Sequence, residues 1–144
     1  QKESYKWIQG SDRSKEVLSK AKAVIIVQDR EGDIFEQFAQ VPDEKTFLLV
    51  RSWVNRKIAD DERLWDKLSE ATVMGQYELH LSSDSHRKEP ARTATMEVRC
   101  VAVEMQRPTN ANKNPVKTVT AYAIEAKEIN SEAKEPVLWR MLTK

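Results

Sequence analysis

Asp29 is the residue of this chain whose position most suggests chemistry. It follows an apolar run at residues 23–27, separated from it only by Gln28, and a helix-like pattern begins a few residues later. Ligands and catalytic groups collect at the carboxyl ends of strands in α/β sheets. A carboxylate there can hold a hard divalent cation if other oxygen ligands converge on it. The alternative is that Asp29 or Asp33 caps the following helix. Asp33 is the better-placed cap and Asp29 the better-placed ligand, and spacing alone leaves both interpretations open.

Common catalytic motifs do not compete with this hypothesis. The sequence has no glycine-rich phosphate loop, no GxSxG and no HExxH, and its three glycines cannot form a dinucleotide-binding fingerprint. His80 falls at a polar strand position and His86 in a polar turn, so we interpret both as solvated surface histidines. Serine-triad or cysteine-nucleophile chemistry therefore has little support.

The composition limits the class of protein. The 144 residues are of single-domain size, and 24 Lys and Arg against 23 Asp and Glu give no global field that would attract nucleic acid or a membrane. Cys100 is the only cysteine, which excludes an internal disulfide and a Cys-rich zinc site and favours a reducing compartment. No apolar run approaches the roughly 18 residues of a membrane span, and the N-terminus lacks the apolar segment of a secretory signal. We therefore expect a cytoplasmic protein.

The first half of the chain predicts alternating helices and strands. Residues 11–22 have a helical pattern with Ser11 or Asp12 as a cap. Residues 24–27 are β-branched without alternation, which predicts a strand covered on both faces, as in a parallel or mixed sheet. A helix pattern at residues 34–38 stops near Pro42, and a second apolar strand covers residues 47–50. This order is typical of an α/β unit, and a short helix is expected around residues 64–68.

The second half has the period of two that is typical of antiparallel strands. It predicts strands at residues 77–81, 93–105, 116–127 and 137–142. Within the second of them the apolar parity changes near Cys100, which predicts a bulge or a bend. We therefore expect an α/β part over residues 1–58 and a mostly antiparallel β part over residues 59–144.

Several sequence blocks occur in the order found in a known family. They are ESYKWIQG, QDREGDIFEQF, FLLVRS, ARTATMEVRC, EINSEAKEP and VLWRMLT. Together they resemble the insertion-sequence-four group of DDE transposases, in the branch of the transposon-five transposase. The resemblance covers nearly the whole chain. It implies an RNase H-like catalytic core, represented in part by residues 1–58, that is interrupted by the β-rich insertion domain of residues 59–144.

The resemblance also implies a reaction and a cofactor. In this family two Asp and one Glu hold two divalent ions, Mg²⁺ or Mn²⁺, that assist attack on a DNA phosphodiester. Asp29 matches the second Asp. The first Asp would precede Gln1 and the Glu would follow Lys144, and a sequence beginning on QKES rather than Met is what an excised piece would show. We therefore expect a fragment of a bacterial cut-and-paste transposase that is inactive alone. Its full-length protein would bind transposon ends as a homodimer.

Four further residues are predicted to contact DNA. Arg51, Arg56 and Lys57 follow the second apolar strand, where the resemblance places phosphate contacts, although a solvated charged turn would look the same. Trp139 in VLWRMLT matches a tryptophan that, in the transposon-five branch, helps hold a base flipped out of the transposon end. The alternative is a core tryptophan in an apolar strand.

Other candidates have simpler interpretations. The basic segment of residues 86–92 could follow a DNA backbone, but a hairpin turn in water has the same composition. Trp7, Trp53 and Trp65 are predicted to be packing residues, with Trp53 the least certain because its charged surroundings could place it near DNA. The competing function is a non-catalytic DNA-binding or protein-interaction module in which Asp29 only caps a helix.

Overall fold

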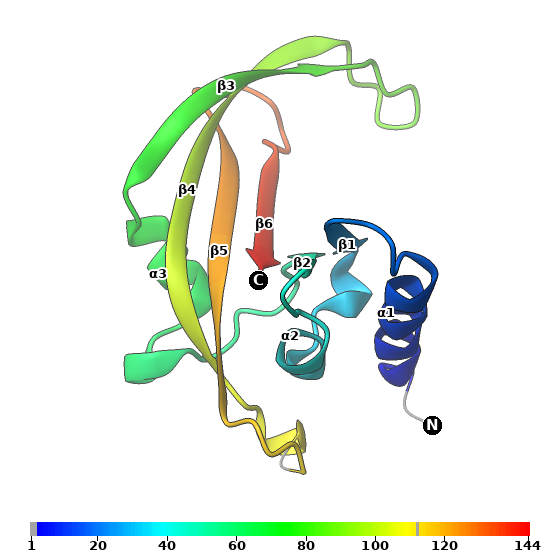
Figure 1. Cartoon of the computed structure of the whole chain (residues 1–144). Coiled ribbons are helices and arrows are strands. Elements are labelled where there is room, and N and C mark those ends of the chain that lie inside the picture. The colour runs from blue at the N-terminus through cyan, green and yellow to red at the C-terminus, as the bar shows by residue number, and fades with distance from the viewer. Residues whose placement is uncertain (1–2, 112) are drawn as a thin grey trace.

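The computed structural model describes residues 3–111 and 113–144, and among these it has six strands in one sheet and three short α-helices. The strand order is β1-β2-β6-β5-β4-β3. Only β1 (Val24–Gln28) and β2 (Thr46–Arg51) are parallel, and every other neighbouring pair is antiparallel. The sheet is strongly curled, and the long strands arch beside the end-on β1 and β2 in Figure 1. The expected mixed α/β class is confirmed.

The two predicted halves of the chain share this sheet. The long strands of the second half are β3 (Val73–Leu81), β4 (Arg92–Gln106) and β5 (Thr118–Ile129). The last strand, β6 (Leu138–Thr143), pairs with β5 on one side and with β2 on the other. Leu48 and Lys144 exchange both backbone hydrogen bonds, at 2.8 and 3.0 Å. The sheet therefore contains strands from both sides of the domain boundary that we expect between residues 58 and 59.

One face of the sheet carries the main core. Helices α2 (Phe35–Gln40) and α3 (Leu64–Glu70) supply Phe38 and Leu68, which pack against Leu48, Met105 and Leu142. Burying side chains of this size stabilises the fold by about 1.5–3 kcal/mol each. A second, smaller cluster lies on the opposite face near the β3–β4 hairpin, and it is formed by Ala94, Met96 and Ala126 with Leu79, Leu81, Val98 and Val137.

These two clusters explain the parity change near Cys100. The β4–β5 register is unbroken from Thr95 to Gln106, so the predicted bulge is not in this pairing. The register shift lies instead on β3, between Val73 and Gly75. Met96 is buried on one face and Met105 on the other. The apolar parity changes because the covered face changes along a single strand.

Two local predictions are wrong. The first helix, α1 (Tyr5–Val17), begins and ends earlier than predicted, and Ser11 is buried within it rather than capping it. Strand β1 is not covered on both faces, because Ile25 and Val27 are 66% and 69% exposed. A β-branched run thus predicts the strand correctly but does not show how many of its faces are covered.

Candidate functional site

Asp29 and Arg51 lie side by side at the carboxyl end of the parallel pair. Gln28 and Val50 are the last register partners of β1 and β2, so the residue after each of them falls at the same edge of the sheet. Asp29 Oδ1 is 3.5 Å from Arg51 Nη1, and their side chains are 59% and 53% exposed. Asp29 precedes a short 3₁₀ turn (Arg30–Gly32), but its side chain makes no capping hydrogen bond. This carboxylate is therefore exposed to an incoming ligand.

Asp33, only four residues later, has the opposite environment. Its side chain is fully buried, and its Oδ2 accepts hydrogen bonds from the backbone N–H groups of Trp53, at 2.7 Å, and Val54, at 3.1 Å. Its Oδ1 pairs with the guanidinium of Arg56. The prediction that Asp33 caps the next helix is wrong, because it joins the loop after β1 to the loop after β2. Helix α2 begins after Ile34, without a side-chain cap.

The two basic residues after this loop are placed differently. Arg56 is only 11% exposed and also donates to the Asp33 carbonyl at 3.1 Å, so its guanidinium positions the loop. Lys57 is exposed and pairs with Asp61, where its charge and hydrogen bond lower the pKa of the Asp61 carboxyl. Contact with DNA stays a prediction for both residues. Lys57 is the more accessible of the two.

A buried polar network fixes the end of β1. Gln28 Nε2 donates to Ser11 Oγ at 3.1 Å, and Gln37 Nε2 donates to Gln28 Oε1, so α1, β1 and α2 are joined at one point. Gly32 packs directly on this network, because a Cβ at residue 32 would lie 2.8 Å from the Gln28 Cβ. Contacts of that kind do not occur between carbon atoms without displacement. The glycine in QDREGD is therefore required for close approach to Gln28, which positions the neighbouring Asp29.

Trp139 lies near Arg51 and is 38% exposed, so it is not a core tryptophan. It lines a pocket of about 480 Å³ together with Arg51, Arg87 and Arg92. The pocket is also lined by Asp84, Glu89 and Glu135, so it carries both positive and negative charges. Of the predicted DNA contacts, Arg51 and Trp139 are thus brought into one cavity, whereas Arg56 and Lys57 line a separate pocket of about 610 Å³.

The sequence predicts that Trp53 is a packing residue, but the structure leaves most of its side chain exposed. It is 57% exposed, and the Arg30 guanidinium carbon lies 4.6 Å from the centre of its ring. The only sequence signal was its charged neighbourhood, RSWVNRK, which is unusual for a buried tryptophan. Trp65 does pack, with Arg140 stacked 4.5 Å from its ring centre.

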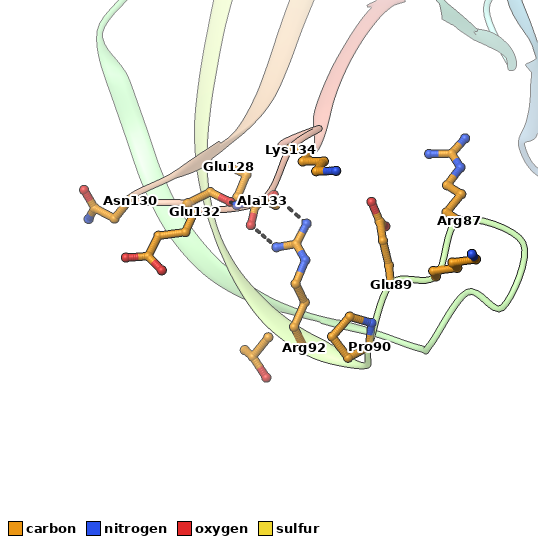
Figure 2. A pocket seen from close by; sticks show the side chains of 12 residues that line it. Arg87, Glu89, Pro90, Arg92, Glu128, Asn130, Glu132, Ala133 and Lys134 are labelled. Carbon is orange, nitrogen blue, oxygen red and sulfur yellow. Dashed lines mark hydrogen bonds and ion pairs between the residues drawn. The ribbon is translucent and has the colours of Figure 1, made fainter.

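The basic segment of residues 86–92 borders a third cavity, of about 700 Å³. Figure 2 shows Arg92 reaching toward Glu128 across it, with Glu89 and Arg87 farther along the loop. Glu128 is buried, and the hydrogen bonds from Arg92 and from the Val137 backbone N–H lower its pKa to about 2. The same pairing raises the pKa of Arg92. Arg92 is therefore committed to an internal ion pair.

A divalent cation would find one suitable ligand at this edge. Across residues 3–111 and 113–144, no three His, Cys, Asp or Glu side chains form a group that could hold a metal ion. Mg²⁺ keeps most of its waters unless several oxygen ligands converge on it. Asp29 could supply one oxygen ligand to such an ion.

The comparisons with known proteins add no assignment. Comparison of the chain with protein-family models finds no match, and comparison with curated proteins finds none either. Within the described part of the chain, no helix is both long and apolar enough to cross a membrane.

Proposed function

We propose that this chain is a piece of a DDE transposase and that Asp29 is one of the three carboxylates of its active site. In this proposal the α/β part belongs to an RNase H-like core and the long β3–β5 strands belong to an insertion domain. The ordered sequence blocks support the family, and the placement of Asp29 supports the role.

The observation that carries the proposal is the contrast between two aspartates in one short motif. Asp33 is buried and bound to Arg56 and two backbone N–H groups. Asp29 is exposed, makes no capping hydrogen bond and lies at the carboxyl end of the parallel strands. Ligands in α/β proteins bind at the carboxyl ends of the strands. Of these two aspartates, Asp29 is therefore the one that remains available for a metal ion.

The described residues have definite tasks in such a site. Divalent ions, when bound, would stabilise the attacking and leaving oxygens of the phosphodiester. Arg51 would lie against a DNA phosphate next to Asp29, because its guanidinium is exposed and held only by a weak surface pair. Lys57 would add a second phosphate contact. Trp139 would stack against a base that has left the duplex.

The test is DNA cleavage by the full-length protein with its own transposon ends and Mn²⁺. Asp29→Ala should abolish cleavage while DNA binding is retained, because the metal ligand is lost and the proposed DNA contacts Arg51, Lys57 and Trp139 stay. Glu31→Gln is the matched control, since Glu31 is also exposed and lies two residues away. The control should cleave like the wild type. Unchanged cleavage by Asp29→Ala would contradict the catalytic assignment.

A non-catalytic DNA-binding module is the second candidate. The observation that favours it is that Arg51 and Trp139 line one pocket, an arrangement that could hold DNA without any contribution from Asp29. The same cleavage experiment separates the two candidates, because a module would bind the transposon ends in all variants and cleave them in none.

A further inference from the structure

Two exposed tryptophans, Trp53 and Trp139, lie at the same end of the β2–β6 pair. Arg51 pairs with Met141, and the Ser52 backbone N–H extends the ladder by donating to the Arg140 carbonyl at 2.7 Å. Trp53 is the next residue after Ser52, and Trp139 is the residue before Arg140. Both rings therefore start from adjacent points of the backbone, beside Arg51.

The backbone of Trp53 is firmly positioned although its ring is exposed. Its N–H donates to the buried Asp33 carboxylate at 2.7 Å, and the next N–H donates to the same oxygen. An exposed aromatic ring offers apolar area that a partner can bury. The contrast with Trp65 is direct, because Trp65 is partly buried under Arg140 and its indole N–H is 3.4 Å from Ser52 Oγ. The backbone of Trp53 is therefore held in place, whereas its ring is 57% exposed.

The charge around Trp53 suits an anionic strand with unpaired bases. Arg30 stacks 4.6 Å from the ring centre, and its pair with Glu31, at 3.7 Å, is exposed and weak. Arg30 can therefore reach a phosphate while it stays near the ring. Nucleobases stack on exposed aromatic rings, and arginine adds to such contacts through cation–π attraction.

We propose that Trp53, with Arg30 beside it, is a stacking platform for an unpaired nucleobase of a DNA strand that passes Asp29 and Arg51. This platform is additional to the base-binding role proposed for Trp139. Its place beside the scissile phosphate rests on the proposed function, but base stacking itself requires no cleavage.

The experiment measures binding of the 144-residue chain to two labelled 12-mers by fluorescence anisotropy at low salt. One is oligothymidine, and the other has the same backbone with abasic sites at every position. The variants are Trp53→Ala, Trp53→Phe and the control Tyr77→Ala, which removes an exposed ring from β3, the strand at the opposite edge of the sheet from β1. Thermal unfolding confirms that each variant is folded.

The platform predicts a loss that depends on the bases. Trp53→Ala should weaken oligothymidine binding by about tenfold, because stacking contributes about 1–3 kcal/mol per base and 1.4 kcal/mol corresponds to tenfold. Affinity for the abasic strand should not change. Trp53→Phe should recover most of the loss, and Tyr77→Ala should bind like the wild type.

Three results would overturn the platform. They are equal weakening toward both strands in Trp53→Ala, no weakening toward either, and no binding of either strand by the wild-type chain. None of these results depends on cleavage, whereas the proposed function fails if the full-length wild type does not cleave or if Asp29→Ala still cleaves. The two failures are therefore distinguishable.

Discussion

Two regions at one end of the sheet contain the same chemical groups and use them in opposite ways. In the exposed rim, Asp29 and Arg51 lie 3.5 Å apart with more than half of each side chain in water. In the buried anchor, Asp33 is fully covered by Arg56 and by the backbone of residues 53 and 54. A surface pair of this kind contributes little to stability, whereas breaking a buried pair is strongly destabilising. The difference shows that the anchor builds the loop and leaves the rim free for a ligand.

The largest expected effect is on the anchor. Asp33→Ala should lower the free energy of unfolding by about 3 kcal/mol or more, because it leaves the Arg56 guanidinium and two backbone N–H groups buried without their acceptor. Denaturant unfolding monitored by circular dichroism measures this change. Asp29→Ala is the matched variant from the rim and should change stability by less than about 0.5 kcal/mol. Equal losses in the two variants would remove the distinction between rim and anchor.

A smaller, pH-dependent effect extends the comparison to another buried pair. The pKa of Glu128 is lowered from 4.5 to about 2 by Arg92. A carboxyl with a lowered folded-state pKa stabilises the fold above its unfolded pKa, and this contribution is lost as the pH falls through the folded value. The stability of the wild type should therefore decline between about pH 4.5 and pH 2. Glu128→Gln should be less stable at pH 7 and show a flatter decline.

Urea titrations at several pH values test this expectation. Glu78→Gln, at an exposed position of β3, is the control and should follow the wild-type curve. A Glu128→Gln curve parallel to the wild type would show that the Arg92 pair does not carry this part of the acid sensitivity.

The smallest expected effect is on the rim itself. Arg51→Gln should leave stability unchanged and weaken DNA binding by a few-fold, because it removes one phosphate contact. The slope of log affinity against log salt should become shallower by about one unit. Arg13→Gln, an exposed arginine on α1, controls for net charge. An identical salt slope in the Arg51 and Arg13 variants would place Arg51 outside the DNA contact.

Local patterns were sufficient to predict most of the elements but not their tertiary relations. The apolar runs at residues 24–27 and 47–50 and the alternation in the second half identified the strands, because side-chain periodicity is a local property. The pairing of β6 with β2 joins segments far apart in the chain, and no local signal specifies it. The bulge predicted near Cys100 lies on the partner strand β3, opposite Val98 and Arg99, because parity alone does not show which of two paired strands carries the extra residue.

The candidate site could likewise be predicted only where it depends on local sequence. The position of Asp29 after a strand could be inferred from the sequence. The burial of Asp33 could not, because it depends on Arg56 and on the loop after β2, which reach Asp33 only in the folded chain. The backbone position of Trp53 likewise depends on the anchor, because its N–H donates to Asp33.

The β2–β6 pairing has a consequence for how the chain acquires its structure. Leu48 exchanges its hydrogen bonds with Lys144, so the third strand beside the parallel pair comes from a segment far along the chain. Contacts between such distant residues require closure of a long loop before they stabilise anything, and they slow folding. During synthesis, β1 and β2 would leave the ribosome well before β6 and wait with an unpaired edge. The rate of refolding should therefore depend more strongly on changes in β6 than on changes in β1.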